Sequence, residues 1–307
     1  MLPFPEFDYA APTSLREAVS LLCTPGARVL AGGTDLLPSL KHRLFEPSLL
    51  VSIRRLGELR EWELLPDGSL ALGAGLSLQQ LARLPALARY PGLQDACRSV
   101  ATPTLQGTAT IGGNILLESR CLYYNQPVGW RDAIGGCLKC SGAVCHVAPK
   151  GRGCYAAHSA DTVPTLWLLG AQVELVGPTG VRLVPISALY SGDGLQPMLV
   201  QPGEILTRLL LPPAEGPTVH RKLRTRAAID YGLLLVAASR IQNGYRAVVS
   251  AVGPAPIEVQ GESPEELAEA AFRAVQPLGT HAPAPTWRKK VLRVEVRRAA
   301  EHLKEVF

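Results

Sequence analysis

The stretch Arg28-Val29-Leu30-Ala31-Gly32-Gly33-Thr34-Asp35-Leu36 predicts a short strand that runs directly into a pair of glycines. A second pair stands in Gln106-Gly107-Thr108-Ala109-Thr110-Ile111-Gly112-Gly113-Asn114. Converging backbone amides bind pyrophosphate, and glycine allows a close approach because it has no Cβ. One glycine pair is more typical of a tight turn. Two such loops, each with a threonine hydroxyl beside it, indicate a site for a phosphate-bearing ligand.

The common nucleotide-binding motifs do not describe these loops. Gly73-Ala74-Gly75 follows a predicted strand, but Leu78 stands where the dinucleotide fingerprint requires a third glycine. The chain also lacks the G-x-x-x-x-G-K-[ST] phosphate loop. We therefore expect neither a Rossmann site nor a P-loop site.

Outward from the loops, the pattern alternates between helices and strands without an internal repeat. Ser14 and Glu17 predict the start of the first helix, and Ser263 with Glu266 predicts a later one. We expect strands at 28–30, 49–53, 61–65, 69–74, 171–176, 181–185, 233–241 and 245–252, and helices at 36–42, 77–84, 93–100 and 162–169. A proline-rich linker at 212–217 separates two α+β domains, residues 1–213 (lobes 1–55 and 56–213) and residues 218–307.

Composition excludes several classes of protein. The 307 residues carry a net charge of +5, and 47% are apolar. Basic residues are scattered except at 288–298, which we interpret as a solvated helix face, so we expect no nucleic-acid partner. No apolar run is long enough to span a membrane, and the first residues do not resemble an export signal, so we expect a cytoplasmic protein.

Cysteines are the second informative pattern. Seven are present, an odd number, and five of them fall between Cys121 and Cys154, which indicates a metal site more than disulfides. Cys23 and Cys97 stand alone among apolar neighbours, where we expect them to be buried as small hydrophobic residues. For the other five, spacing leaves two alternatives open. Four thiolates can hold a 4Fe–4S cluster, and Cys137-Leu138-Lys139-Cys140 with Cys145 and His146 can build a tetrahedral zinc site.

Taken together, several motifs resemble those of the flavin subunits of the xanthine dehydrogenase and carbon monoxide dehydrogenase family of molybdenum hydroxylases. Besides the two glycine loops, the motifs are Asp161-Thr162-Val163-Pro164 with Leu169-Gly170-Ala171, Pro202-Gly203-Glu204-Ile205-Leu206, and Arg221-Lys222-Leu223-Arg224. The resemblance extends from about Phe7 to the end of the chain. It implies a two-lobed FAD-binding domain followed by a C-terminal α+β domain.

The resemblance also assigns roles to residues. FAD-binding positions would be Leu30, Ala31, Gly32, Gly33, Thr34, Asp35, Leu36, Thr110, Ile111, Gly112, Gly113, Asn114, Asp161, Leu206 and Lys222. From position alone, two alternative interpretations stay open: Asp161 as a helix N-cap, a role compatible with flavin binding, and Lys222 as a solvated charge. His146 and His158 are expected to be structural. No catalytic arrangement of side chains stands out, which agrees with a subunit whose cofactor carries the chemistry.

Residues 116–159 interrupt the family pattern, and this insertion resembles the one in the β-subunit of 4-hydroxybenzoyl-CoA reductase. That resemblance implies a 4Fe–4S cluster on Cys121, Cys137, Cys145 and Cys154, and it favours iron–sulfur over zinc. Cys140 departs from the related pattern, which has no cysteine there.

The family resemblance finally implies partners. They are a large molybdopterin-binding subunit, where substrate would react, and a small subunit with two 2Fe–2S clusters, arranged as a heterohexamer. This chain would pass electrons between FAD, its own cluster and those clusters, and an external carrier such as ferredoxin would exchange electrons with it. The implied substrate is an aromatic acyl-CoA such as 4-hydroxybenzoyl-CoA. The alternative is a zinc-stabilised FAD or nucleotide-binding module without redox turnover.

Overall fold

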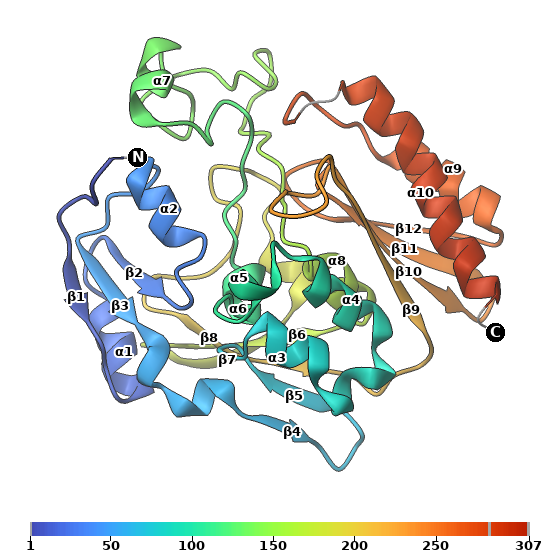
Figure 1. Ribbon diagram of the computed structural model, residues 1–307, viewed down its shortest axis with the longest axis horizontal. Helices are drawn as coiled ribbons and strands as arrows, with labels where there is room; N and C mark the ends of the chain where they lie inside the picture. The colour runs from blue at the N-terminus through green and yellow to red at the C-terminus, as the bar shows by residue number, and fades with distance from the viewer. Residues whose placement is uncertain (1, 282–283, 306–307) are drawn as a thin grey trace.

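The computed structural model describes residues 2–281 and 284–305. Three sheets follow one another along the chain, and Figure 1 shows them around the centre of the molecule, with the cysteine-rich insertion projecting beyond them. Within the described residues, no helix combines the length and the apolar character needed to cross a bilayer.

The first sheet is parallel and has the strand order β1-β3-β2. Ser14 accepts a hydrogen bond from the Glu17 amide, as predicted, and the helix that follows buries Ala18 and Leu22. The elements of this lobe are β1 (Asp8–Ala10), α1 (Leu15–Leu22), β2 (Ala27–Leu30), α2 (Leu36–Lys41) and β3 (Leu49–Ser52). Because β2 ends at Leu30, its carboxyl end delivers the first glycine loop.

The second sheet is antiparallel, with the strand order β4-β5-β8-β6-β7. Its strands are β4 (Trp62–Leu64), β5 (Leu70–Gly73), β6 (Gln172–Gly177), β7 (Gly180–Pro185) and β8 (Ile205–Leu211). The helices between β5 and β6 are α3 (Leu78–Arg83), α4 (Pro91–Ser99), α5 (Pro103–Gln106), α6 (Ile111–Ile115), α7 (Val128–Ala133) and α8 (Val163–Leu168). Residues from α3, α4, α6 and α8 pack on this sheet in one apolar core.

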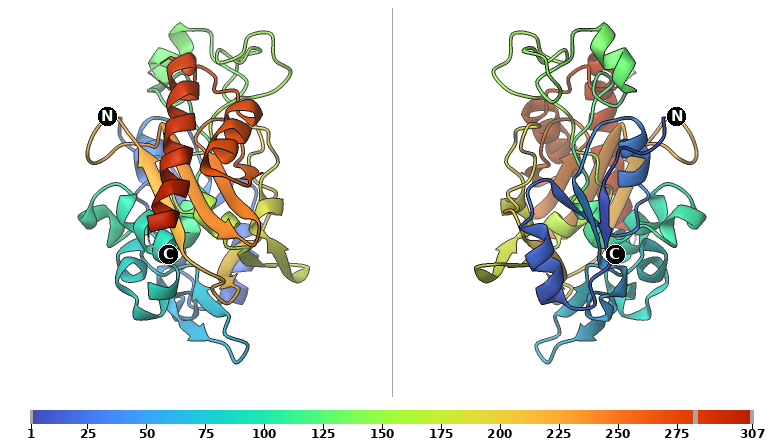
Figure 2. Two further views of the ribbon diagram at one scale, coloured as in Figure 1. Left: turned by 90° about the vertical axis from the view of Figure 1, so that its right-hand side faces the viewer. Right: turned by 90° about the vertical axis from the view of Figure 1, so that its left-hand side faces the viewer.

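The third sheet is antiparallel, has the order β12-β11-β10-β9, and is covered on both faces. Its elements are β9 (Thr218–Leu223), β10 (Leu234–Ile241), β11 (Gly244–Ser250), β12 (Ile257–Gly261), α9 (Pro264–Ala274) and α10 (Pro285–Glu305). Val236 packs toward α9 and α10, whereas its neighbour Ala237 packs toward Leu168 of α8, as the alternation of a strand requires. Figure 2 shows α9 and α10 side by side on the outer face of this sheet.

The predicted strands and helices are present with ends that differ by at most a few residues, and Ser263 caps α9 as expected. The basic stretch 288–298 was only partly interpreted correctly. Arg293 and Arg297 have half-exposed side chains on α10, but Arg288 is fully buried. Its guanidinium donates to the carbonyls of Leu233 and Leu278. Those carbonyls lie outside helices and strands, and Arg288 supplies them with a buried donor.

The insertion differs from the regions around the three sheets in having little regular structure. Within residues 116–159 the described helix is α7, and short bridges such as Arg120 with Ala157 hold the ends together. Its apolar cluster is small and consists largely of cysteine and tyrosine side chains with Leu44 and Ala156. Side chains, rather than a backbone ladder, therefore define this segment.

Candidate cofactor site

A cavity of about 640 Å³ lies among the two glycine loops, β8 and the loop at 226–231 of the C-terminal part. This volume is within the range of small-molecule and cofactor sites. Twelve of the predicted residues line it: Ala31, Gly32, Gly33, Thr34, Asp35, Leu36, Thr110, Gly112, Gly113, Asn114, Asp161 and Leu206. Leu30, Ile111 and Lys222 are outside the lining. Ile111 is fully buried in the core instead.

The first glycine loop is shaped by close packing against the second. A Cβ on Gly32 would lie 2.1 Å from the carbonyl oxygen of Thr108, and Gly33 has a left-handed φ of +70°. Both positions therefore require glycine. Within the described residues, the amides of Gly32, Gly33 and Thr34 donate to no protein acceptor. They are donors that an anionic group in the cavity could use.

The second loop is built differently from the prediction, because its amides already have acceptors. The Gly112 amide donates to the Ala74 carbonyl at 2.9 Å, and the Gly113 amide donates to Thr110 Oγ1 at 3.1 Å. A Cβ on Gly112 would lie 2.8 Å from the Ala74 Cβ, whereas a Cβ on Gly113 would meet only Thr110 Oγ1, at 3.0 Å. Gly112 thus lets α6 pack closely, and Gly113 keeps the cavity wall free of a side chain.

Asp161 lies at the cavity wall in a buried ion pair with Lys222, whose Nζ is 2.6 Å from Asp161 Oδ1. Burial raises the pKa of Asp161, and the Lys222 ammonium opposes that shift. Both interpretations from position alone were therefore wrong. Lys222 is buried rather than solvated, and the N-cap of α8 is Thr162, because Lys222 takes the Asp161 carboxylate. The amide and hydroxyl of Thr162 donate to Asn114 Oδ1 of the second loop.

Asp35 joins three parts of the chain at the edge of the cavity. The Arg120 guanidinium donates to Asp35 Oδ2 and, at 2.8 Å, to Ser39 Oγ. The Tyr231 hydroxyl donates to the other Asp35 oxygen at 3.3 Å. Sequence reasoning missed Arg120 and Tyr231, since no local pattern marks a contact between residues so far apart in the chain. Arg120 directly precedes Cys121, so this contact fixes the base of the insertion beside the first glycine loop.

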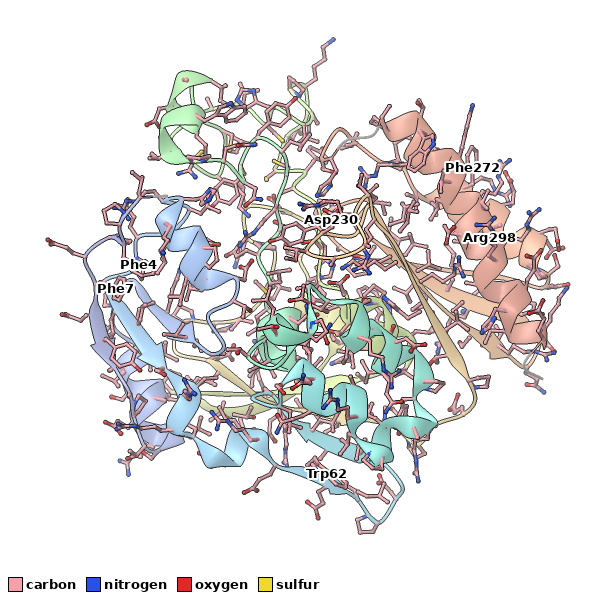
Figure 3. The ribbon with its side chains drawn as sticks, in the orientation of Figure 1. Phe4, Phe7, Trp62, Asp230, Phe272 and Arg298 are labelled. Atoms are coloured by element: carbon pink, nitrogen blue, oxygen red, sulfur yellow. The ribbon has the colours of Figure 1, made fainter. Side chains whose placement is uncertain are left out.

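The four predicted metal ligands lie together. Cys121, Cys137, Cys145 and Cys154 line one hollow, which Tyr123, Tyr124, Leu138, Lys139, His146 and Val147 complete. Cys140 is outside that lining, and its sulfur lies 3.5 Å from the Cys137 sulfur. The yellow sulfur atoms of the insertion are visible in Figure 3, above the loop that carries the cavity residue Asp230.

Burial governs the chemistry of these thiols. It raises the pKa of Cys121 and Cys154, and it raises that of Cys137 to about 11. A ligand that binds thiolates would therefore displace protons here. Among the described residues, no three His, Cys, Asp or Glu side chains converge closely enough to hold a single metal ion.

The two remaining cysteines differ from each other. Cys97 is fully buried, as expected, and burial raises its pKa to about 12. Cys23 is exposed, contrary to expectation, because it is the C-cap residue of α1 and lies just beyond the face that packs. His158 is buried and forms a hydrogen bond with the Ser250 hydroxyl, which agrees with a structural role. His146 lines the hollow and forms a hydrogen bond with the Gly136 carbonyl.

Comparison with known proteins places this architecture. The family described as "FAD binding domain in molybdopterin dehydrogenase" matches residues 5–214. The aldehyde oxidoreductase FAD-binding subunit PaoB of Escherichia coli (strain K12) is 33% identical over 237 residues, 74% of each chain. The carbon monoxide dehydrogenase medium chain of Afipia carboxidovorans is 29% identical over 256 residues, 80% of this chain and 73% of the relative. The crystal structure of quinoline 2-oxidoreductase from Pseudomonas putida 86 shares the fold, with a TM-score of 0.75 at 23% identity over 98% of this chain and 99% of that one.

Proposed function

This chain belongs to the family of FAD-binding domains in molybdopterin dehydrogenases, and from that premise we propose that it carries two redox centres, FAD and a 4Fe–4S cluster. Membership makes it the FAD-binding medium subunit of a molybdenum hydroxylase, an oxidoreductase. The 4Fe–4S cluster is proposed because four cysteines line one hollow: Cys121, Cys137, Cys145 and Cys154.

The large cavity fits FAD in size and in chemistry. Its wall combines unpartnered amides of the first glycine loop with apolar side chains such as Leu36, Leu78 and Leu206. We assign pyrophosphate binding to the backbone amides of Gly32, Gly33 and Thr34. On the opposite wall, Gly113 would let the FAD approach the backbone closely. Asp161, held in place by Lys222, and the side chain of Asn114 complete the polar wall. When bound, FAD can exchange electrons in pairs with one redox partner and one at a time with another.

The four cysteines that line the hollow match the donor set of a 4Fe–4S cluster, which takes four terminal thiolates around a body larger than one ion. The hollow itself has a volume of only about 10 Å³, so the loop that carries the cysteines would have to widen as the cluster binds. The four sulfurs come from separate parts of the insertion, so binding would fix its irregular backbone. The contact between Cys137 and Cys140 favours the alternative, a zinc ion on a C-x-x-C pair. We propose the cluster because Cys140 is outside the lining that the other four share.

The assembly is part of the same proposal. Several relatives are named as subunits of larger enzymes, such as the 6-hydroxypseudooxynicotine dehydrogenase complex subunit alpha of Paenarthrobacter nicotinovorans. We propose that this chain joins a molybdopterin-binding large subunit and a 2Fe–2S small subunit, as two copies of each. We propose an aromatic acyl-CoA such as 4-hydroxybenzoyl-CoA as the substrate of the large subunit, and ferredoxin as the external carrier. Residues 1–213 and 218–307 would be the two domains of this chain.

Anaerobic purification of the complex, followed by iron, zinc and flavin analysis, tests both centres. We expect one FAD and about four iron atoms per copy of this chain, beyond the iron of the small subunit. Zinc in place of that iron would establish the alternative module. Flavin without either metal would leave only the FAD assignment standing.

A further inference from the structure

A buried ion pair lies between the flavin cavity and the cysteine hollow. Lys139 lines the hollow, and Glu118 lines the cavity. Lys139 Nζ is 3.3 Å from Glu118 Oε2, and it also donates to the carbonyl oxygen of Ser119 at 3.0 Å. The Lys139 side chain is only 7% exposed. A buried ammonium is costly unless it is paired, so this charge is fixed in place by its partners.

Glu118 is shared with a second cation on the cavity side. Its other carboxylate oxygen lies 3.8 Å from the guanidinium of Arg28, which also lines the cavity. A continuous row of charges therefore runs from the hollow through Lys139 and Glu118 to Arg28. Of the two sites, Lys139 belongs to the lining of the hollow alone and Glu118 to that of the cavity alone.

Two other cations of the insertion are engaged elsewhere. Arg120 pairs with Asp35, and Arg131 donates to the carbonyls of Gln126 and Arg43. Lys139 also lies over the ring of Tyr124, with Nζ 4.9 Å from the centroid. Lys139 lines the same hollow as the four thiols, so its charge lies beside any group that they hold.

We propose that Lys139 raises the reduction potential of the cluster and that Glu118 moderates this effect while lowering the potential of the flavin. The inference rests on the proposed function, because it assigns roles relative to the two cofactors. An electron added to the cluster adds negative charge, which a fixed cation stabilises in a medium of low dielectric constant. The carboxylate has the opposite effect, and it acts on both sites because it lies between them.

Two substitutions of nearly unchanged volume separate these contributions. In the purified complex, Lys139→Met should shift the cluster to a more negative midpoint potential. Glu118→Gln should shift both the cluster and the flavin to more positive potentials. Lys150→Met removes a charge from an exposed position of the same insertion and is the matched control. The potentials are read from a redox titration that follows the paramagnetic signal of the reduced cluster and the flavin absorbance.

Opposite shifts of the cluster potential, each larger than that of the control, would support the inference. A full-iron Lys139→Met complex with an unchanged or more positive potential would overturn it, as would shifts of the same sign in both variants. If the Lys139→Met complex loses its iron, the Glu118→Gln complex alone tests the inference. An unchanged cluster potential in Glu118→Gln would then overturn it. Wild-type protein that lacks the iron contradicts the proposed cluster itself, so the two failures are distinguishable.

Discussion

The flavin cavity and the cysteine hollow differ in what forms their walls. The cavity is walled by elements anchored in extended sheets with large apolar cores, and its glycine loops are fixed by backbone packing. The hollow is walled by side chains of an irregular segment, whose own apolar cluster is small. A site of the first kind exists before its ligand binds, whereas one of the second kind is stabilised largely by what it binds. The two sites should therefore respond oppositely to the same kinds of change.

The largest effect should come from removing a thiolate. Cys121→Ser is expected to lose most of the cluster iron, from about four atoms per chain to less than about one, because the cluster needs all four terminal ligands. The insertion should then become sensitive to protease while FAD occupancy stays near that of the wild type. Cys145→Ser and Cys154→Ser should behave alike. Iron retained in Cys121→Ser would contradict the ligand set, and flavin lost with the iron would contradict the independence of the two sites.

Gly113→Val should produce the reverse pattern. A Cβ there would meet only Thr110 Oγ1, at 3.0 Å, so the variant should fold with a small shift of that hydroxyl. Because Gly113 lines the flavin cavity, the added side chain would lie at the cavity wall. We expect FAD binding weakened at least about tenfold, roughly 1.4 kcal/mol, with cluster iron unchanged. Flavin titration of the variant measures this. Gly216→Val, in the open linker away from the cavity, is the matched control. Full flavin affinity in a folded Gly113→Val protein would mean that the flavin does not approach this wall.

The same contrast explains what the sequence could predict. Local patterns were sufficient for most helices and strands and for the first glycine loop, because caps, alternation and glycine act over a few residues. They missed the strands β1, β8, β9 and β12. Of these, β8 is a central strand that pairs with β5 and β6 from far along the chain. They also missed the contact of Arg120 with Asp35, which depends on how the insertion lies against the first lobe. The pair of Lys139 and Glu118 was missed because it depends on how the insertion itself folds. The second loop has a sequence like that of the first, but its glycine amides donate to Ala74 and Thr110 within the protein.

A smaller effect should appear at the junction between the insertion and the third sheet. His158 is fully buried there, and burial lowers its pKa to about 3. In the unfolded chain its pKa is near 6.5, so the unfolded state binds the extra proton between these values. Stability from this residue is therefore complete above pH 6.5 and falls as the pH drops toward 3.

Urea unfolding at pH 7.5 and at pH 5.5 measures this contribution. His158→Asn retains a polar group near Ser250 but does not titrate in this range. The decrease in the free energy of unfolding between the two pH values should be smaller in the variant by about 1.4 kcal/mol. The buried His220 titrates in the same direction in both proteins and cancels in the comparison. An equal decrease in both proteins would show that His158 is protonated in the folded state.

The smallest expected change is the most discriminating for the hollow. Cys140 lies beside Cys137 but outside the lining that Cys121, Cys145 and Cys154 share with it, so Cys140→Ser should leave about four iron atoms per chain. A zinc ion on the C-x-x-C pair needs both sulfurs, so the same substitution would then remove the metal. Cys140→Ser and Cys121→Ser are thus a matched pair, analysed for iron and zinc side by side. Iron that depends on Cys140 but survives loss of Cys121 would reverse the assignment, because the cluster would then be held by a differently folded loop.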